Sequence, residues 1–209
     1  MSLKLRPYQS GAIQGIYNYF HVDTGNPLVV IPTAGGKSLV MAMFVEGVLK
    51  AFPDQRILIV THVRELIEQN YTELKKLWPE APAGIYSAGL KQRDIRARIL
   101  FAGIQSIHKR VYDVQQCDLV LIDEAHLIPR SSNTMYRRFL ADLARLNPQM
   151  KVIGLTATPY RLDSGLLHEG GDAIFTDIAY EVSVRELIDQ GYLSPLISKR
   201  MATQIDLTG

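Results

Sequence analysis

Two short polar segments of this sequence contain residue types that can bind phosphate and a divalent cation. The first is a Gly-Gly-Lys-Ser sequence that follows the aliphatic run Leu28–Ile31. Gly35 and Gly36 allow a tight turn whose backbone N–H groups face an anion, and the helix expected from Lys37 adds the positive end of its dipole. In such a loop Lys37 would contact the β- and γ-phosphates of a nucleotide, and the Ser38 hydroxyl would bind Mg²⁺. The strict phosphate-loop pattern starts with a glycine that this chain lacks, so a plain glycine turn with an exposed lysine is the alternative.

The second segment, Asp123–His126 (Asp-Glu-Ala-His), follows the aliphatic run Leu119–Ile122. Two adjacent acids directly after a buried strand are costly unless a cation pairs with them. Asp123 would hold Mg²⁺ through water, and Glu124 would orient and deprotonate an attacking water. A helix N-terminus, which also favours acids, is the alternative. We interpret His126 as a coupling, hydrogen-bonding residue, because no second His or Cys has the spacing of a metal ligand.

Short aliphatic runs predict the strands that position these segments. Runs of four to six apolar residues, rich in Val and Ile, are typical of strands buried on both faces. The five expected strands are Leu28–Ile31, Arg56–Thr61, Arg98–Ala102, Asp118–Ile122 and Lys151–Leu155. Helical spacing of apolar residues predicts helices between most of them. The expected helices are one that starts at Pro7, Lys37–Lys50, Val63–Leu77, Thr134–Leu146 and Val184–Gln190.

This alternation predicts an α/β fold, with a mostly parallel sheet covered by helices on both faces. Ligands bind at the carboxyl ends of the strands in such a sheet. Four of the expected strands lead into an unusual polar segment, and we expect these four segments to meet at one edge of the sheet. In the third expected helix, Asn70 shares one stripe with the apolar residues Leu66, Ile67, Leu74 and Leu77.

The composition is that of an ordinary globular domain, with 47% hydrophobic and 21% charged residues among 209. It excludes a disordered chain, a collagen-like repeat and a disulfide scaffold, and the length predicts one domain. The one cysteine, Cys117, cannot form an intrachain disulfide and is interpreted as a small core residue. Because no secretory signal and no membrane-length apolar run is visible, we expect a cytoplasmic protein.

The net charge of +2 does not by itself indicate a nucleic-acid partner. Residues 91–110, however, contain six basic side chains and one acidic side chain, Asp94. Such a segment can follow a phosphate backbone, and its binding would then depend strongly on salt. The alternative is a solvated basic face. The six basic residues are Lys91, Arg93, Arg96, Arg98, Lys109 and Arg110.

Five segments with distinctive residues follow one another along the chain. They are Leu5–Gln9 (Leu-Arg-Pro-Tyr-Gln), Pro32–Ser38, Thr61–Leu66, Asp123–His126 and Thr156–Pro159. Together they resemble the first RecA-like domain of a superfamily 2 helicase of the DEAD/DEAH class. The resemblance implies a RecA-like P-loop NTPase domain over residues 1–195, and a linker or edge segment over residues 196–209 that leads to a second RecA-like domain. The sequences at 88–91 (Ala-Gly-Leu-Lys) and 154–161 are similar to the RadD-like DNA-repair group, with type III restriction ATPase subunits as close relatives.

The resemblance implies a role for each matched residue. Gln9 matches a glutamine that reads the adenine edge, with Arg6 beside the base; a glutamine that faces solvent on a helix is the alternative. Thr156 and Thr158 match a segment that couples the nucleotide to the nucleic-acid site, the alternative being a plain strand-to-turn sequence. The residues expected to bind ATP are Arg6, Gln9, Pro32, Thr33, Ala34, Gly35, Gly36, Lys37, Ser38 and Leu39.

A nucleic-acid face is implied in the same way. Matched positions would grip the sugar-phosphate backbone of one strand, which positions the protein without reading base sequence. The residues expected on this face are Thr61, Arg64, Gly103, Gln105, Ser106, Lys91 and Arg93. DNA is the expected partner and RNA the less favoured one.

We therefore expect the ATP-binding domain of a Mg²⁺-dependent DNA helicase or translocase. Two alternatives are the ATPase subunit of a restriction-type complex that does not unwind DNA, and a nucleotide-sensing module without turnover. Such a motor needs a second RecA-like domain with an arginine finger, and no later segment of this chain matches one. Because the loss of an arginine finger costs about 10³–10⁵ in turnover, we expect these 209 residues alone to be nearly inactive.

Overall fold

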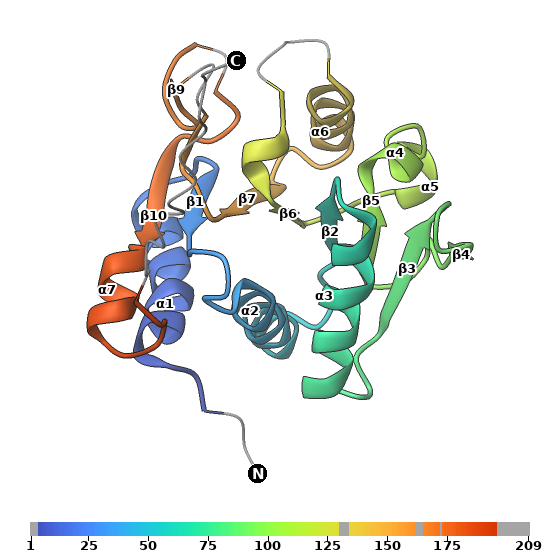
Figure 1. Cartoon of the computed structure of the whole chain (residues 1–209). Coiled ribbons are helices and arrows are strands. Elements are labelled where there is room, and N and C mark those ends of the chain that lie inside the picture. The colour runs from blue at the N-terminus through green and yellow to red at the C-terminus, as the bar shows by residue number, and fades with distance from the viewer. Residues whose placement is uncertain (1–3, 130–133, 162–164, 172, 196–209) are drawn as a thin grey trace, which may run out of the picture.

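An eight-stranded sheet forms the centre of the computed structural model, which describes residues 4–129, 134–161, 165–171 and 173–195 (Figure 1). The strands lie in the order β10-β1-β7-β6-β2-β5-β3-β4. All neighbours are parallel except the hairpin β3–β4. The strands are β1 (Pro27–Val30), β2 (Ile57–Thr61), β3 (Ala83–Ser87), β4 (Gln92–Arg93), β5 (Ile99–Gly103), β6 (Leu119–Asp123), β7 (Lys151–Thr156) and β10 (Asp177–Glu181). A separate antiparallel ribbon pairs β8 (Tyr160–Arg161) with β9 (Gly165–Leu166).

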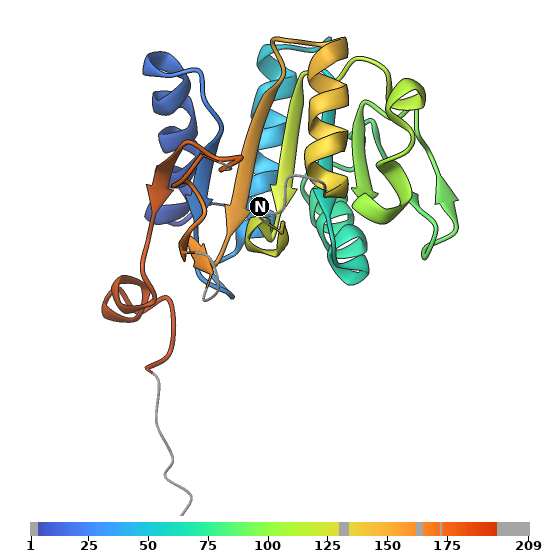
Figure 2. The same cartoon turned by 90° about the horizontal axis from the view of Figure 1, so that it is seen from above.

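Helices cover both faces of the sheet. Figure 1 shows α1, α2 and α3 on one face and α4, α5 and α6 on the other, while Figure 2 shows α7 set apart from these layers. The helices are α1 (Pro7–Val22), α2 (Lys37–Ala51), α3 (Arg64–Leu77), α4 (Ile104–Ile107), α5 (Val111–Val114), α6 (Met135–Leu146) and α7 (Val184–Asp189), with a short 3₁₀ helix η1 (Ala125–Leu127) after β6. Among the described helices, none combines the length and the apolar composition needed to cross a membrane.

Each central strand contributes to two hydrophobic cores, because successive side chains of a strand point to opposite faces. In β2, Ile57 and Ile59 belong to the core that includes residues of α1, α2 and α3, whereas Leu58 and Val60 belong to the core that includes residues of α4, α5 and α6. All four side chains are at most 1% exposed. This two-sided burial explains why the strands are continuous aliphatic runs, and it confirms the expected α/β class.

The strands that precede the four polar segments, β1, β7, β6 and β2, are direct neighbours in the sheet. Because they are parallel, their carboxyl ends form one edge, which we call the carboxyl rim. The prediction that the four segments meet there is confirmed. The five expected strands and five expected helices are present, with ends that differ by at most one residue.

Three strands of the sheet were not expected from the sequence. β3 lacks an aliphatic run because Gly84 lies against Asp94 and Ala97, where an added Cβ would come within 2.6 Å of Asp94 Cβ. β4 has two exposed residues, and β10 is an edge strand whose residues are partly or fully exposed. Periodicity in apolar residues cannot identify such strands. The expected linker or edge segment at 196–209 lies outside the described residues.

Candidate nucleotide site at the carboxyl rim

The loop between β1 and α2 needs its two glycines for different reasons. Gly36 has φ 80°, and a Cβ there would lie 2.6 Å from Gln9 Nε2. At Gly35 a Cβ would lie 2.5 Å from Ile31 Cγ2. Ala34 also adopts a left-handed conformation, with φ 67°, which costs a non-glycine residue about 1 kcal/mol. The loop therefore curls tightly into the N-terminus of α2, which is the geometry that an anion-binding loop requires.

Helix α1 holds this loop from the side. The Tyr8 hydroxyl donates to the Gly35 carbonyl over 2.8 Å, and Gln9 Nε2 donates to the same oxygen over 3.3 Å. Gln9 Oε1 accepts from the Arg6 backbone N–H over 3.0 Å. Gln9 is 4% exposed, so the alternative in which it faces solvent is wrong. Of the loop itself, Pro32 is buried, Thr33 and Ala34 are exposed, and Ser38 and Leu39 are partly buried at the start of α2.

Lys37 and Glu124 connect the loop to the acidic segment. Lys37 Nζ lies 3.5 Å from Glu124 Oε1 and 3.5 Å from the Ile31 carbonyl oxygen. The side chains of Lys37 and Glu124 are 11% and 19% exposed, so the pair is largely shielded from water. Glu124 has φ 53°, which turns the chain sharply after β6. The alternative of a solvent-exposed lysine after a plain glycine turn is wrong.

Asp123 is buried at the end of β6. Its Oδ2 accepts from Asn70 Nδ2 over 2.7 Å, and its Oδ1 accepts from the Glu124 backbone N–H over 3.0 Å. Burial raises the pKa of the Asp123 carboxyl, whereas the Asn70 hydrogen bond and the charge of Lys37 lower it. A buried carboxylate with this balance is short of positive charge, which fits the binding of a cation.

The donor set also fits Mg²⁺ held together with a nucleotide. Within the described part of the chain, no group of three or more His, Cys, Asp or Glu side chains could hold a metal by itself. A cation at Asp123 would therefore need ligands from elsewhere, and phosphate oxygens together with Ser38 supply the hard oxygen donors that Mg²⁺ prefers.

The residues expected to couple the site form a chain of polar contacts. His126 Nδ1 lies 3.2 Å from Glu124 Oε2 and 3.0 Å from Thr156 Oγ1. The Thr156 hydroxyl donates to the Thr158 carbonyl over 2.9 Å and accepts from the Thr158 N–H over 3.1 Å. Thr156 is fully buried, so its hydroxyl serves only these partners. Arg161 Nε donates to the His126 carbonyl, which ties the segment after β7 to the acidic segment.

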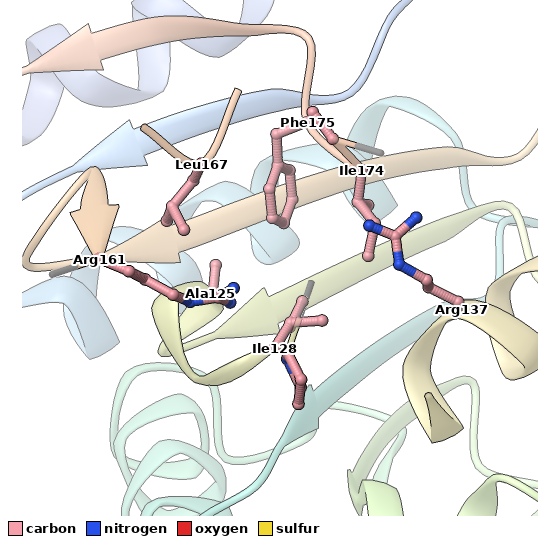
Figure 3. Close-up of a pocket in the computed structure, with 9 residues that line it drawn as sticks. Ala125, Ile128, Arg137, Arg161, Leu167, Ile174 and Phe175 are labelled. Carbon is pink, nitrogen blue, oxygen red and sulfur yellow. The ribbon is translucent and has the colours of Figure 1, made fainter. Parts of the chain in front are cut away.

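A pocket of mixed polar and apolar lining lies beside η1 (Figure 3). Ile128, Leu167 and Phe175 give it an apolar wall, and Arg137 and Arg161 line it with guanidinium groups. The acids of the site, Asp123 and Glu124, are not among its lining residues. The pocket therefore lies next to the nucleotide site without belonging to it.

The structure brings together most of the residues expected on the nucleic-acid face, at the carboxyl ends of β2, β3 and β5. Gln105 Nε2 donates to the His62 carbonyl over 3.3 Å, and Ser106 Oγ accepts from the Ala88 N–H over 2.9 Å. Arg64 is exposed at the start of α3, and a Cβ at Gly89 would lie 3.1 Å from its Cδ.

Two of the expected contact residues present little or no surface there. Thr61 and Gly103 are both buried, and the Thr61 hydroxyl accepts from the Val63 N–H over 3.3 Å. They shape the turns that follow β2 and β5. A role for either in direct contact with a nucleic acid stays a prediction.

The basic segment 91–110 does not form one continuous surface. Lys91 and Arg93 belong to the β3–β4 hairpin near this face, with the Arg93 guanidinium 5.3 Å from the Tyr86 ring centre. Arg98, in contrast, precedes β5 and donates to the Pro53 carbonyl at the opposite end of the sheet. A single phosphate track along the whole segment is therefore wrong, because Lys91 and Arg93 lie near the carboxyl ends of the strands and Arg98 lies at the opposite end.

Two contacts at this rim were not expected from the sequence. Asn70 had a visible signal, a polar residue within an apolar helix stripe, but nothing in the pattern named Asp123 as its partner. Tyr192, which follows α7, lies under the Arg6 guanidinium at 5.0 Å from ring centre to Cζ and 5.3 Å from the Tyr8 ring. No spacing in the sequence relates Tyr192 to Arg6.

Similarity to known proteins identifies the family of this chain. The sequence model of a family described as type III restriction enzyme, res subunit, matches residues 2–161. The chain belongs to this family. Its fold and motifs are those of the first RecA-like domain of a superfamily 2 helicase, which confirms the resemblance drawn from the five segments.

The relatives of this chain include proteins that are named as helicases. It is 28% identical over 214 residues to the putative ATP-dependent helicase IRC3 of Saccharomyces cerevisiae, covering 98% of this chain and 30% of IRC3. It is 30% identical to the DNA 3'-5' helicase XPB of Kineococcus radiotolerans, covering 91% of this chain and 32% of that protein. The chain thus spans about a third of the length of these relatives.

Solved structures share the fold at low identity. The UvsW helicase from bacteriophage T4 superposes with a TM-score of 0.63 at 18% identity, covering 85% of this chain and 60% of UvsW. The type ISP restriction-modification enzyme LlaGI, solved with a DNA substrate mimic, gives a TM-score of 0.65 at 13% identity, covering 91% of this chain and 21% of LlaGI. The chain is therefore a domain of the ATP-dependent DNA helicase and translocase family.

Proposed function

We propose that this domain binds ATP with Mg²⁺ and, together with a second RecA-like domain, hydrolyses it to move along or remodel DNA. The observation that carries the proposal is the 3.5 Å approach of Lys37 Nζ to Glu124 Oε1, which joins the curled loop after β1 to the acids after β6. A phosphate-binding ammonium and a potential general base next to each other are what ATP hydrolysis requires.

Each residue has a distinct task in the proposed reaction. Backbone N–H groups of the loop and the Lys37 ammonium would hold the β- and γ-phosphates. Ser38 and Asp123 would hold Mg²⁺, which supplies positive charge to the phosphate oxygens. Glu124 would take the proton of the attacking water as the water oxygen bonds to the γ-phosphorus and the bond to ADP breaks.

The remaining contacts would connect this reaction to its surroundings. Glu124 Oε2 lies beside His126, which contacts Thr156, and Thr156 in turn contacts Thr158. A change in the position or charge of Glu124 would therefore affect both threonines. Gln9 and Arg6 would recognise the base from α1. DNA is the proposed partner because the relative XPB is a named DNA helicase and the structural neighbour LlaGI was solved with a DNA substrate mimic.

A second candidate function is a restriction-complex ATPase that translocates without unwinding. The match to a type III restriction subunit and the fold shared with LlaGI favour it. Both functions use the same ATP site. A strand-displacement assay on the full-length protein separates them, because only a helicase releases the annealed strand.

The test of the proposed ATP site uses Glu124→Gln in the full-length protein. Removing a general base lowers turnover by about 10²–10⁴, while the neutral isostere leaves ATP binding intact. Steady-state ATPase with DNA and equilibrium binding of a fluorescent ATP analogue measure the two effects. Glu68→Gln, an exposed change on α3, is the matched control and keeps wild-type turnover. Full turnover in Glu124→Gln would remove Glu124 from this role.

A further inference from the structure

Asn70 is a buried polar residue in the apolar stripe of α3. It is 1% exposed and lies on the same face as Ile67 and Leu74, which are also buried. Burying an amide in such a place is unfavourable unless its polar atoms are paired. Its Nδ2 is paired with Asp123 Oδ2 over 2.7 Å, so this side chain links α3 to the end of β6.

The other polar atom of the same amide has no such partner. Asn70 Oδ1 is buried and makes no hydrogen bond within the described residues. An unpaired buried acceptor lowers stability, and an apolar side chain of similar size would avoid that penalty. Packing of α3 therefore does not account for an asparagine here, whereas the contact with Asp123 does.

The contact fixes the orientation of the Asp123 carboxylate. One oxygen accepts from Asn70 and the other from the Glu124 backbone N–H. The Glu124 donor belongs to the same turn as Asp123 and moves with it. Asn70 is the donor that comes from a separate element, so a shift of α3 changes the hydrogen bonding of only one of the two oxygens.

The start of α3 faces the region expected to bind nucleic acid. Arg64, the first residue of the helix, is exposed beside Gly89. Six residues of helix, about 9 Å, separate Arg64 from Asn70, and a helix transmits a displacement over such a length as a rigid unit. A displacement of the exposed end of α3 would therefore also move Asn70 relative to the Asp123 carboxylate.

We propose that Asn70 is a positioning residue that couples nucleic-acid contacts at the start of α3 to the orientation of the Asp123 carboxylate. This inference rests on the proposed function, because Asp123 must hold Mg²⁺ for its orientation to affect hydrolysis. Nucleic acid bound at Arg64 sets the position of α3, and the Asn70 amide then sets the oxygen that faces the cation.

The decisive variant is Asn70→Leu in the full-length protein, because leucine keeps the volume and removes both the donor and the unpaired oxygen. We expect DNA-stimulated ATPase, relative to ATPase without DNA, to fall about tenfold, which corresponds to the loss of one hydrogen bond to a charged group. The Mg²⁺ concentration for half-maximal ATPase rises, and the gain in fluorescent ATP-analogue affinity on adding Mg²⁺ shrinks. DNA affinity, measured by anisotropy, stays within about twofold of wild type.

Asn70→Ala provides a second variant, and Asn147→Leu provides the control. Asn147 is also buried and also donates to an aspartate, Asp118, but at the other end of β6. It should leave the Mg²⁺ requirement and the DNA stimulation ratio unchanged. An unchanged ratio and Mg²⁺ requirement in Asn70→Leu would overturn the inference, and so would a parallel loss in Asn147→Leu.

The outcomes also separate this inference from the function on which it rests. If the wild-type full-length protein showed neither ATP binding nor hydrolysis, the proposed function would fail. If the wild type is active and Asn70→Leu loses DNA affinity in proportion to ATPase, then Asn70 shapes the binding face and does not couple it, and the inference alone fails.

Discussion

Strand β6 has an aspartate–asparagine pair at each end, and the two pairs differ in how their hydrogen bonds are completed. At the amino end, Asp118 Oδ2 accepts from the Arg56 N–H over 2.8 Å and Asp118 Oδ1 accepts from Asn147 Nδ2 over 3.0 Å. Asn147 Nδ2 also donates to the Cys117 carbonyl, and Asn147 Oδ1 accepts from the Gln149 N–H over 3.0 Å. Both polar atoms of the Asn147 amide are therefore paired within the protein.

At the carboxyl end the corresponding pair is incomplete. Asn70 Oδ1 makes no hydrogen bond within the described residues, and burial raises the pKa of Asp123. Glu124, the next residue, is held in a left-handed conformation. The same two residue types thus complete their hydrogen bonds at one end of the strand, whereas at the other end they leave a buried acceptor, Asn70 Oδ1, without a donor. Completed hydrogen bonds indicate structure, and buried groups left short of partners indicate a place for a ligand.

The largest expected effect is on hydrolysis. Asp123→Asn removes the charge that would hold Mg²⁺, and we expect the DNA-stimulated ATPase of the full-length protein to fall about 10- to 100-fold, as for residues that hold a metal through water. Asp118→Asn changes the matching residue at the amino end and should keep wild-type turnover well below its melting temperature. Equal losses in the two variants would remove the distinction between the two ends.

The next largest effect is on the free energy of unfolding, and here the change at the amino end of β6 has the larger effect. Asn147→Leu leaves the Cys117 carbonyl and an Asp118 oxygen without their donor, and we expect the free energy of unfolding to fall by about 1–3 kcal/mol. Asn70→Leu loses one donor but also removes an unpaired oxygen, so its free energy of unfolding should change by less than that. Urea unfolding without nucleotide or metal measures both. A larger loss in Asn70→Leu would mean that the carboxyl-end pair is structural.

This contrast also explains what could be predicted from the sequence. The strands that are buried on both faces, such as β2 and β6, are visible in the sequence as aliphatic runs. Asp123 and Glu124 follow such a run directly, and Lys37 follows another after a short glycine-containing loop. The edge strand β10 is not visible, because a half-exposed strand needs no aliphatic run. The four parallel strands of the site could therefore be identified in the sequence, but the edge strand β10, which pairs with β1, could not.

Contacts between elements that are far apart in the sequence could not be predicted from it. Asn70 interrupts an apolar stripe, which marks it as unusual, but its partner 53 positions away depends on how α3 lies on the sheet. The Arg6–Tyr192 contact likewise depends on where the chain returns after α7. The separation of Lys91 and Arg93 from Arg98 has the same origin, because local charge does not reveal at which end of the sheet a residue lies.

The smallest expected effect concerns Cys117, which precedes Asp118 at the amino end. Burial raises the pKa of its thiol to about 12, and its Sγ lies 3.3 Å from the Leu119 carbonyl oxygen. At pH 8 only about one thiol in 10⁴ is then ionised, so a disulfide reagent should label the folded protein only as fast as it unfolds. Asn147→Leu should speed labelling in proportion to its lost stability, whereas Asn70→Leu should label like the wild type. Rapid labelling of the native wild type would show that the amino end opens without global unfolding. The contrast between the two ends of β6 would then be lost, because it requires the hydrogen bonds of the amino end to stay closed while those of the carboxyl end are incomplete.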